Sequence, residues 1–269
     1  ILIPTYSIID DNIIITSDQG IDLPDGKIIN NFINNSTSGN AIECDSLCEI
    51  YNNDIEINGN SNGIFGNKII IDDNRISGSS TGFGIWIPGH AEVSEVSNNT
   101  INLSNGSGVY VTDYAVFDMK NNLVLSNLTV IGNHARWTGG IQVYKSTNII
   151  IKNSFFKDNY AQLHTGAIQM VGNSTAALIN LTIIENDGGS GVACYDGCEV
   201  NITNSIIRNN LSDQIRFYYD EPFTDAINTI SITHSNIAGG LDEIETNLYF
   251  NNVNWLTDNI DSDPLFVDP

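Results

Sequence analysis

The sequence predicts an all-β solenoid, a fold in which short coils stack and each strand pairs in parallel with its copy one coil away. Two marks recur along the 269 residues at intervals of 21 to 32 residues. The segments between them have apolar residues at i and i+2, with Asn, Gly, Asp and Ser between the runs, which is typical of strands. A unit of this length is too short for a βαβ crossover, which needs roughly 30 or more residues.

The first mark is an Ile or Val that usually follows a small residue, and the second is an Asn near the next apolar run. Stacked coils bring equivalent side chains to about 4.8 Å from one another. We therefore predict a buried ladder in which each Asn amide donates to one neighbour and accepts from the other; the alternative is that Asn merely suits turns. The first set is Ile42, Ile64, Ile85, Val109, Ile141, Ile168, Val192 and Ile215, and the second is Asn53, Asn74, Asn99, Asn127, Asn153, Asn180 and Asn204.

Two neighbouring repeats are nearly the same: "NLTVIGNHARWTGGIQ" (127–142) and "NSFFKDNYAQLHTGAIQ" (153–169). Each opens with Asn, reaches a second Asn six positions on and has Gly before Ile-Gln. This pattern resembles the repeats of right-handed parallel β-helix proteins of the pectate-lyase-like superfamily, and is closest to the secreted bacterial and archaeal repeat proteins of that type. The ending "NIDSDPLFVDP" also resembles a terminal segment common in such proteins.

The resemblance covers about residues 28–265 and implies one right-handed, single-stranded parallel β-helix of about eight or more coils. We expect coils over 28–239, an N-terminal cap over 1–27 and a C-terminal cap segment over 240–269. Such a fold hosts lyases, hydrolases, epimerases, adhesins and structural shafts, so it specifies chemistry poorly.

Composition narrows the partners and the compartment. The formal charge of −22 argues against nucleic acid and anionic membranes, and against polyanionic sugars unless a bound cation or a local basic patch intervenes. The sequence has no run of about 18 apolar residues, so we expect no membrane insertion. We expect a piece of a longer exported protein, located outside the cell or on its surface.

Four cysteines form two pairs with the same spacing, "CDSLC" (Cys44 and Cys48) and "CYDGC" (Cys194 and Cys198). The pairs lie six coils apart, about 29 Å at 4.8 Å per coil, so they cannot share one zinc ion. A disulfide needs Cα atoms about 4.4 to 6.8 Å apart, which residues i and i+4 reach across a turn. We predict two local disulfides, in keeping with export; four buried free thiols are the alternative.

An aromatic face follows from the alternation of strand side chains. If Ile42 and its equivalents point inward, the alternate residues point outward. Amphipathic rings on such a face suit stacking against sugars, although aromatic residues also favour exposed strands. Long connections after Ile85 and Val109 would border this face. The candidate ligand-binding residues are Trp86, Tyr110, Tyr144, Tyr195 and Tyr218.

Catalysis on this face would use the ionisable residues nearest to it. A hydrolase needs two carboxyl groups about 5 to 9.5 Å apart, whereas Asp113 and Asp196 are three coils, roughly 14 Å, apart. Asp113 also suits a salt bridge with Lys145, and the motifs of polygalacturonases and pectate lyases are absent. The catalytic candidates are Asp113, Lys145, His90 and Arg216, with Asp196 and Asp220 nearby.

The acidic ending "DNIDSDP" places Asp258, Asp261 and Asp263 close in sequence. Their oxygen atoms are ligands that calcium accepts, but the EF-hand spacing is missing and turn formation explains them better, so we expect no metal or cofactor. The favoured function is an exported structural or adhesive protein whose aromatic face contacts a polysaccharide or cell-surface glycan. The alternative is a polysaccharide lyase or glycoside hydrolase acting on the same face.

Overall fold

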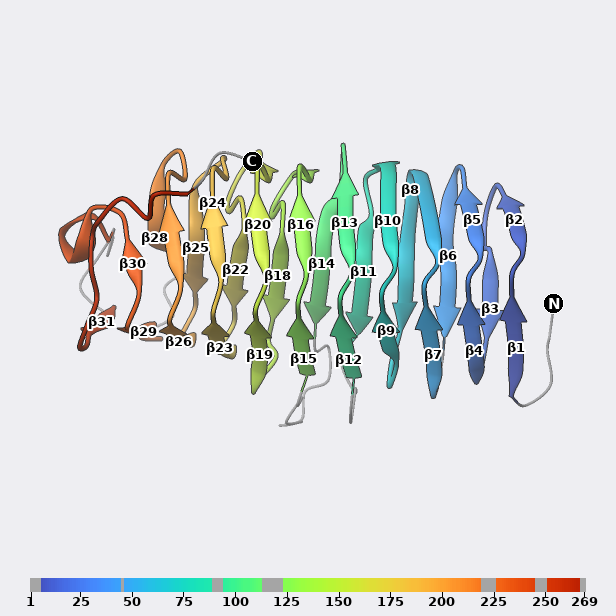
Figure 1. Cartoon of the computed structure of the whole chain (residues 1–269), viewed down its shortest axis with the longest axis horizontal. Coiled ribbons are helices and arrows are strands. Elements are labelled where there is room, and N and C mark those ends of the chain that lie inside the picture. Colours follow the sequence, from blue (N-terminus) through green and yellow to red (C-terminus); the bar gives the residue numbers. More distant parts are fainter. Residues whose placement is uncertain are drawn as a thin grey trace.

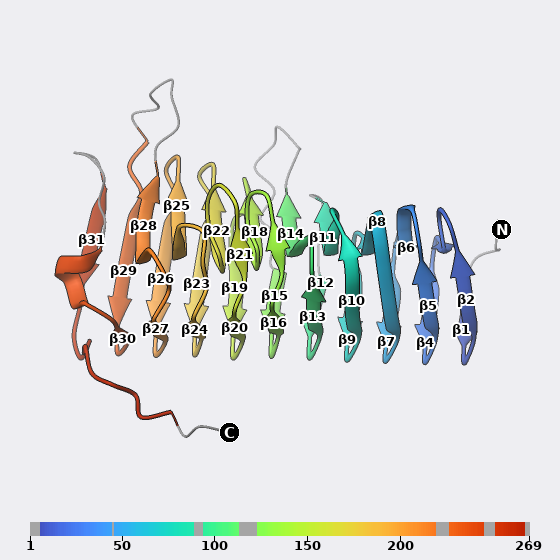
Figure 2. The ribbon, with the colours of Figure 1, turned by 90° about the horizontal axis from the view of Figure 1, so that it is seen from above.

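The protein is a parallel β-solenoid of about nine coils stacked in one row from the N-terminal to the C-terminal end (Figure 1). The computed structural model describes residues 6–44, 46–88, 94–112, 123–218, 226–244 and 251–266. Three sheets, termed A, B and C, run along the stack, and the chain passes through them in that order in each coil (Figure 2). Among the described residues, no helix has the length and apolarity needed to cross a membrane.

The strands of each sheet pair in parallel with those of the neighbouring coils. Sheet A contains β1 (Ser7–Asp10), β4 (Gly26–Ile29), β7 (Cys48–Tyr51), β9 (Ile70–Asp72), β12 (Ser94–Ser97), β15 (Leu123–Ser126), β19 (Ile149–Lys152), β23 (Thr175–Ile179), β26 (Glu199–Thr203), β29 (Thr229–Thr233) and β31 (Asn252–Trp255). Sheet B contains β2 (Ile13–Thr16), β5 (Phe32–Asn35), β10 (Arg75–Ser80), β13 (Thr100–Leu103), β16 (Thr129–Ile131), β20 (Phe155–Lys157), β24 (Thr182–Ile184), β27 (Ile206–Arg208) and β30 (Asn236–Ile237). Sheet C contains β3 (Ile21–Leu23), β6 (Ser38–Cys44), β11 (Phe83–Pro88), β14 (Ser107–Thr112), β18 (Ile141–Tyr144), β22 (Ile168–Val171), β25 (Ser190–Tyr195) and β28 (Asp213–Tyr218).

Strand β8 (Asp54–Gly66) runs through both sheet B and sheet C. The coils begin earlier than expected, because β1, β2 and β3 already pair with β4, β5 and β6. The expected N-terminal cap over 1–27 is therefore a regular coil from Ser7 on. At the other end, the 3₁₀ helix η1 (Gly240–Glu243) contacts β28 and β30, and β31 extends sheet A.

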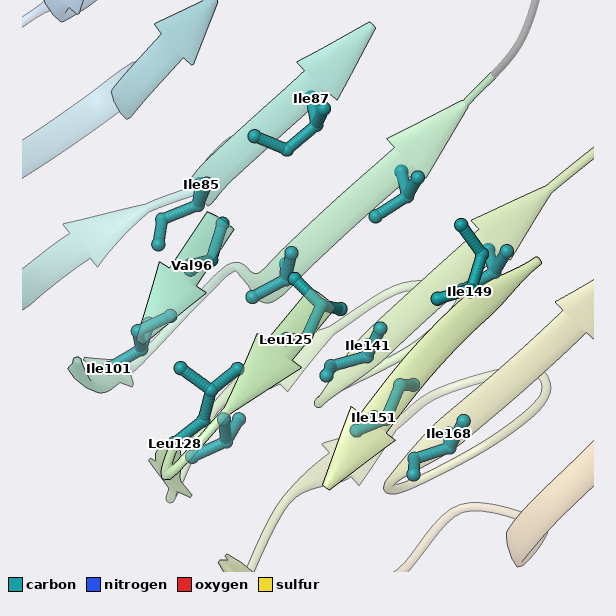
Figure 3. Packing of buried hydrophobic residues seen from close by; sticks show 14 of the residues in the cluster. Ile85, Ile87, Val96, Ile101, Leu125, Leu128, Ile141, Ile149, Ile151 and Ile168 are labelled. Atoms are coloured by element: carbon teal, nitrogen blue, oxygen red, sulfur yellow. The ribbon is translucent and has the colours of Figure 1, made fainter. Parts of the chain in front are cut away.

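The apolar repeat of the sequence forms the core. Each Ile or Val of the first mark pairs with the next one along the chain, from Ile42 with Ile64 to Val192 with Ile215. All of these side chains are buried, and together with inward residues of sheets A and B they fill the interior (Figure 3). The predicted parallel solenoid is confirmed, including the register of sheet C.

The predicted asparagine ladder is confirmed over the first coils. Asn31, Asn53, Asn74 and Asn99 are buried at the turn from sheet A to sheet B. Each of the first three donates its side-chain N–H to the Oδ1 of the next at 2.9 to 3.0 Å. The same Oδ1 also accepts the backbone N–H of the preceding Asn at 2.9 to 3.0 Å.

For Asn127, Asn153, Asn180 and Asn204 the prediction of a buried ladder is wrong. These residues are exposed, with φ of 52° to 55°, and each precedes the ladder position by one residue. The ladder position holds Leu128, Ser154, Leu181 and Ser205 instead, and the Ser hydroxyls accept the backbone N–H of Leu128 and Leu181. Asn recurs outside because its short polar side chain tolerates the left-handed region that this turn requires.

A second buried ladder lies at the end of the sheet B strands in the later coils. Asn133, Asn159, Asn186 and Asn210 are buried there. Each of the first three donates its Nδ2–H to the Oδ1 of the next at 2.8 to 3.0 Å. Buried amides thus move from one turn of the coil to another after Asn99.

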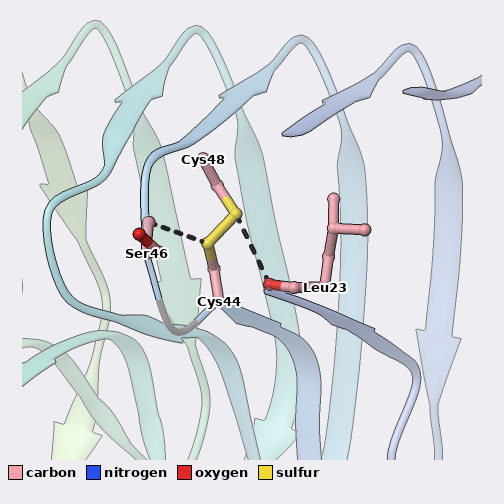
Figure 4. Close-up of a disulfide and its surroundings, with 4 residues drawn as sticks. All are labelled: Leu23, Cys44, Ser46 and Cys48. Atoms are coloured by element: carbon pink, nitrogen blue, oxygen red, sulfur yellow. Dashed lines mark hydrogen bonds between the residues drawn. A yellow bond between two sulfur atoms is a disulfide. The ribbon is translucent and has the colours of Figure 1, made fainter. Parts of the chain in front are cut away.

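One of the two predicted disulfides is present. Cys44 and Cys48 are bonded across the turn from sheet C to sheet A, with Cα atoms 6.3 Å apart (Figure 4). The predicted Cys194–Cys198 disulfide is wrong, since both residues are buried free thiols. Burial raises the pKa of the Cys194 thiol well above its usual value and raises that of Cys198 to about 12. Both sulfurs lie within the apolar core, which favours the neutral thiol.

Candidate functional site

An aromatic cluster covers the outer face of sheet C where β8, β11 and β14 lie side by side. Phe65, Trp86 and Tyr110 occupy one outward column, as predicted for the last two. The ring centroids of Phe65 and Trp86 are 4.9 Å apart, and those of Trp86 and Tyr110 are 6.0 Å apart. Phe83, which the sequence analysis did not identify, stacks on Tyr110 at 4.6 Å. The outward positions of Trp86 and Tyr110 are therefore confirmed.

Tyr144 lies apart from this cluster. It pairs with Thr112 rather than with Tyr110, so it belongs to the neighbouring outward column of sheet C. The Nζ atom of Lys145 lies 5.0 Å from the centroid of the Tyr144 ring. The pair is a local cation–π contact on the strand surface.

A lobe projects from the later coils at the turn from sheet B to sheet C. In the earlier coils this turn is tight, since β10 ends at Ser80 and β11 begins at Phe83. In the later coils β16 ends at Ile131 and β18 begins only at Ile141. The additional residues, 132–140, 159–167 and 186–189, are termed the lobe. They contain β17 (His134–Ala135) and β21 (Tyr160–Ala161), which pair in parallel.

The lobe is fixed at its base by the second asparagine ladder. Asn133 and Asn159 directly precede β17 and β21 and are hydrogen-bonded to each other, so successive lobe segments stack in register. Gly188 closes the third segment with φ of 95°, and a Cβ atom there would overlap the backbone carbonyl of Ala161. Only glycine accepts both the conformation and the close approach. The lobe is thus a packed extension of the solenoid.

A cleft of about 530 Å³ lies where the tight turns of the earlier coils meet the lobe. Its volume is within the range of small-ligand sites, roughly 300 to 1,000 Å³. Aromatic rings, amides, hydroxyls and one guanidinium line it. The lining residues are Thr81, Phe83, Ser104, Asn105, Gly106, Ser107, His134, Ala135, Arg136, Trp137, Gln142, Tyr160 and Gln162.

The lobe side of the cleft presents exposed rings. Trp137 is 46% exposed and Tyr160 is 36% exposed. The ring of His134 lies 5.3 Å from that of Tyr160, and the guanidinium carbon of Arg136 lies 5.1 Å from the centroid of Trp137. Flat amphipathic surfaces with nearby hydrogen-bonding groups suit the apolar faces and hydroxyl edges of sugars.

The charge of the cleft differs from that of the chain as a whole. The described lining contains no Asp or Glu, although the protein has 32 acidic residues against 10 Lys and Arg. Ion pairs among the described residues use other cations, such as Lys27, Arg75 and Arg208, and Arg136 takes part in none of them. Arg136 therefore supplies a local positive charge to the cleft.

A second group of rings supports Trp137 from behind. The imidazole of His164 stacks against Trp137 with centroids 4.9 Å apart and rings inclined by 17°. His164 Nδ1 is hydrogen-bonded to the hydroxyl of Tyr195, and the Tyr218 hydroxyl donates to the His164 carbonyl at 3.1 Å. The rings of Tyr195 and Tyr218 stack at 4.7 Å. This chain of contacts fixes the position of Trp137, the lobe residue that faces the cleft.

Tyr195 is not available to a ligand, contrary to the sequence prediction. It is only 2% exposed, because His164 of the lobe lies over it. Tyr218 is half-buried, with the Arg216 guanidinium carbon 4.6 Å from its ring centroid. The predicted face therefore ends at the lobe, and only Trp86, Tyr110, Tyr144 and part of Tyr218 remain accessible on it.

The catalytic candidates do not form a common site among the described residues. His90, Asp113 and Asp220 lie outside the described residues. Lys145 contacts Tyr144, and Arg216 forms an ion pair with Asp213 at 3.3 Å. None of the described candidates lines the cleft.

The acidic C-terminal residues have separate protein partners. Asp258 lies 3.2 Å from the His234 imidazole, and Asp263 accepts the backbone N–H of Leu265 at 2.9 Å. Asp261 binds Arg208 at 2.6 Å, and this hydrogen bond lowers the pKa of Asp261. Within the described ranges, no three His, Cys, Asp or Glu residues gather as a metal site would require.

Most residues that build the cleft were not predicted as site residues from the sequence. Phe83, His134, Arg136, Trp137 and Tyr160 all lie outside the columns set by the apolar anchors. A signal was present, because the second Asn of each repeat, six positions after the first, marks the start of each lobe segment. The apolar period of the sequence predicts where the strands lie, but it does not predict which turns are longer and form an additional structure such as the lobe.

Residues 128–254 match the family model described as a right handed beta helix region. Neither a curated protein nor a solved structure matches the chain. The matched segment contains the lobe, which forms one side of the cleft, whereas the residues of the other side, such as Phe83 and Asn105, lie before it.

Proposed function

We propose that this right-handed parallel β-helix protein, whose fold is consistent with the pectate-lyase-like superfamily, binds a polysaccharide or cell-surface glycan in the cleft beside its lobe. The observation that carries the proposal is the lining, in which Phe83, Trp137 and Tyr160 surround a hollow edged by amides and hydroxyls. Such a mixture stacks on the apolar face of a sugar and hydrogen-bonds to its hydroxyl groups. The proposal places the protein outside the cell or on its surface, where such glycans occur.

The charge of the lining favours a glycan that carries carboxylate or sulfate groups. Arg136 has no ion-pair partner among the described residues, and no carboxylate lines the described part of the cleft. A guanidinium binds planar oxyanions with two parallel hydrogen bonds. The acidic surface would repel such a glycan elsewhere, so binding would be confined to the cleft.

A catalytic function on the same glycan is the second candidate, and the lining favours a lyase over a hydrolase. A glycoside hydrolase needs two carboxyl groups, which the described lining lacks. A lyase needs a base and a group that neutralises the uronate charge; His134 or Tyr160 would be the base, and Arg136 would be the neutralising cation. New unsaturated products would distinguish this function from binding.

The test is a glycan array followed by titration of each bound glycan and an assay for cleavage products. Trp137→Ala should weaken binding about fivefold, because a stacking contact is worth about 1 kcal/mol. Trp255→Ala is the matched control, since Trp255 lies in β31 at the far end of sheet A. Equal affinities of the wild type and Trp137→Ala for all bound glycans would contradict the proposed site.

The charge preference has its own pair of variants. Arg136→Gln should weaken binding of an acidic glycan and abolish most of its salt dependence, while leaving neutral glycans unaffected. Lys152→Gln removes a charge from β19 on sheet A, away from the cleft, and should change neither. A preference for neutral glycans in the wild type would refute the role of Arg136.

A further inference from the structure

The turn from sheet A to sheet B carries a row of exposed asparagines along the solenoid. This turn column is defined by the left-handed residue of each later coil, with φ between 52° and 55°. Three neighbouring pairs are hydrogen-bonded through their amides at 2.7 to 3.1 Å, namely Asn98 with Asn127, Asn153 with Asn180 and Asn180 with Asn204, so these side chains point out of the coil side by side. The turn column consists of Asn98, Asn127, Asn153, Asn180 and Asn204.

We propose that the turn column is a site of N-linked glycosylation, at Asn180 and at either Asn127 or Asn98. Each of these three residues is followed two positions later by Thr, in "NNT", "NLT" and "NLT", which is the acceptor motif for an N-linked glycan. Acceptor sites belong on surface turns of exported proteins, and the turn column is such a surface. The modification requires the export that is part of the function proposed above, but not a functional cleft.

The reaction would transfer an oligosaccharide from a lipid-linked donor in a secretory compartment. The asparagine Nδ2 forms a bond to the anomeric carbon of the first sugar, the bond from that carbon to the lipid phosphate breaks, and Nδ2 loses one proton. The linked amide keeps one N–H. Asn180 therefore retains a donor for Asn153 Oδ1, which it now contacts at 2.9 Å.

Burial separates these sites from two other copies of the motif, although the exposed Asn173 and Asn201, outside the turn column, carry it as well. Asn35 and Asn210 also carry the motif, but both are buried, and Asn210 belongs to the second ladder. A sugar on either Nδ2 would have to enter the core, so a chain modified there would not fold. Folded, secreted molecules should therefore be unmodified at these two positions.

Stacking also limits occupancy within the turn column. Asn98 and Asn127 are on adjacent coils, and the Nδ2 of Asn127 lies 3.1 Å from Oδ1 of Asn98. Two glycans cannot leave side chains this close without overlap, whereas Asn180 is two coils further on. One molecule should thus carry at most two glycans in this column.

The turn column leaves the cleft accessible. It lies where sheet A leads into sheet B, and the cleft lies where sheet B leads into sheet C. Asn105 is the informative contrast, because it carries the motif "NGS" and lines the cleft. A glycan on Asn105 would occupy the space assigned to a ligand.

The experiment is secretion of the full chain from yeast with a signal peptide, followed by mapping of glycosylated peptides and intact mass before and after enzymatic release of N-glycans. Thr182→Ala removes the motif of Asn180 without changing its amide, and should lower the mass by one glycan. Asn153→Gln is the control in the same column, since Phe155 at the third position leaves no motif, and it should not change the mass.

Glycans at Asn180 and at one of Asn98 and Asn127, with none at Asn35 or Asn210, would support the proposal. Secreted protein without glycan at Asn180, or secreted molecules with Asn98 and Asn127 both occupied, would overturn it. If the chain is retained in the cell, the retained chain is mapped in the same way, because the oligosaccharide is transferred before the chain folds. An unmodified Asn180 in the retained chain would also contradict the proposal. Glycan binding by the cleft is measured separately, so the two proposals fail independently.

Discussion

The two asparagine rows allow a direct test of what holds the later coils together. Asn159 is fully buried in the second ladder, whereas Asn153, six residues earlier in the same repeat, is exposed in the turn column. We predict that Asn159→Leu strongly destabilises the protein and that Asn153→Gly hardly does. Glycine is the appropriate control, because it adopts the φ of 52° at this position without strain.

The magnitude follows from the partners that Asn159 would abandon. Its Oδ1 accepts the backbone N–H of Asn133 at 3.1 Å and the Asn133 Nδ2–H at 2.8 Å, and its Nδ2 donates to the Val130 carbonyl at 2.8 Å and to Asn186 Oδ1 at 2.9 Å. Leucine would leave the Asn133 backbone N–H and the Val130 carbonyl without these partners, at about 1 to 3 kcal/mol each. Asn133 Nδ2 and Asn186 Oδ1 would each lose one hydrogen bond and keep another, at about 0.5 kcal/mol each. Burying the leucine side chain returns about 2 kcal/mol, so at the middle of these ranges the net loss is about 3 kcal/mol.

Asn153→Gly removes one hydrogen bond, from Asn180 at 2.9 Å, and water replaces it at this exposed position. The loss should stay below about 1 kcal/mol. Thermal unfolding followed by far-ultraviolet circular dichroism measures both variants. For a chain of this size, Asn159→Leu should lower Tm by about 6 to 12 °C. A Tm within 1 °C or so of the wild type for Asn159→Leu, or equal losses in both variants, would refute this account of the ladder.

Three further results are expected. Replacing Cys44 and Cys48 by Ser should reduce stability by about 2 kcal/mol, as expected for a short closed loop, and reductant should then lower Tm only in the wild type; a reductant-insensitive wild type would contradict the bond. Burial raises the pKa of Cys198 in the folded protein from about 9 to about 12, so the thiol of the unfolded chain ionises first as the pH rises. The free energy of unfolding should therefore fall between pH 9 and 12, and it should fall less in Cys198→Ala. Parallel pH profiles of the two proteins would rule this out. Gly188→Ala should lower Tm and weaken ligand binding together, because the lobe must shift away from Ala161; unchanged binding would show that the lobe does not shape the cleft.

The core of this fold could be predicted from sequence, because its determinants are periodic. Ile42, Ile85 and their equivalents recur once per coil, and burying one β-branched side chain beneath its copy leaves little choice of register. The outward direction of Trp86 and Tyr110 then follows from strand alternation alone. These predictions concern positions whose environment repeats from coil to coil.

The asparagines were harder to place, because adjacent residues serve opposite roles at the same turn. Asn98 is the exposed left-handed residue and Asn99 is the buried ladder residue. Both the exposed and the buried position favour Asn. Where only one of the two adjacent residues is Asn, the repeat period alone does not tell which position that Asn occupies. Leu128 directly after Asn127 indicates the answer, since an apolar residue at the ladder position leaves the exposed role to Asn127.

The burial of Tyr195 and the presence of the cleft have a common cause that lies outside the strands. Up to Asn99, buried amides brace the turn between sheets A and B, and the turn between sheets B and C stays tight. From Asn133 on, the amides brace the second turn, where each can hold the backbone of a longer connection. That change of turn creates a step in the outline of the solenoid, which covers Tyr195 on one side and opens a hollow beside Phe83 on the other. A uniform solenoid offers a ligand only a ribbed face, so the place where the ladder changes turn is where a site with depth can form.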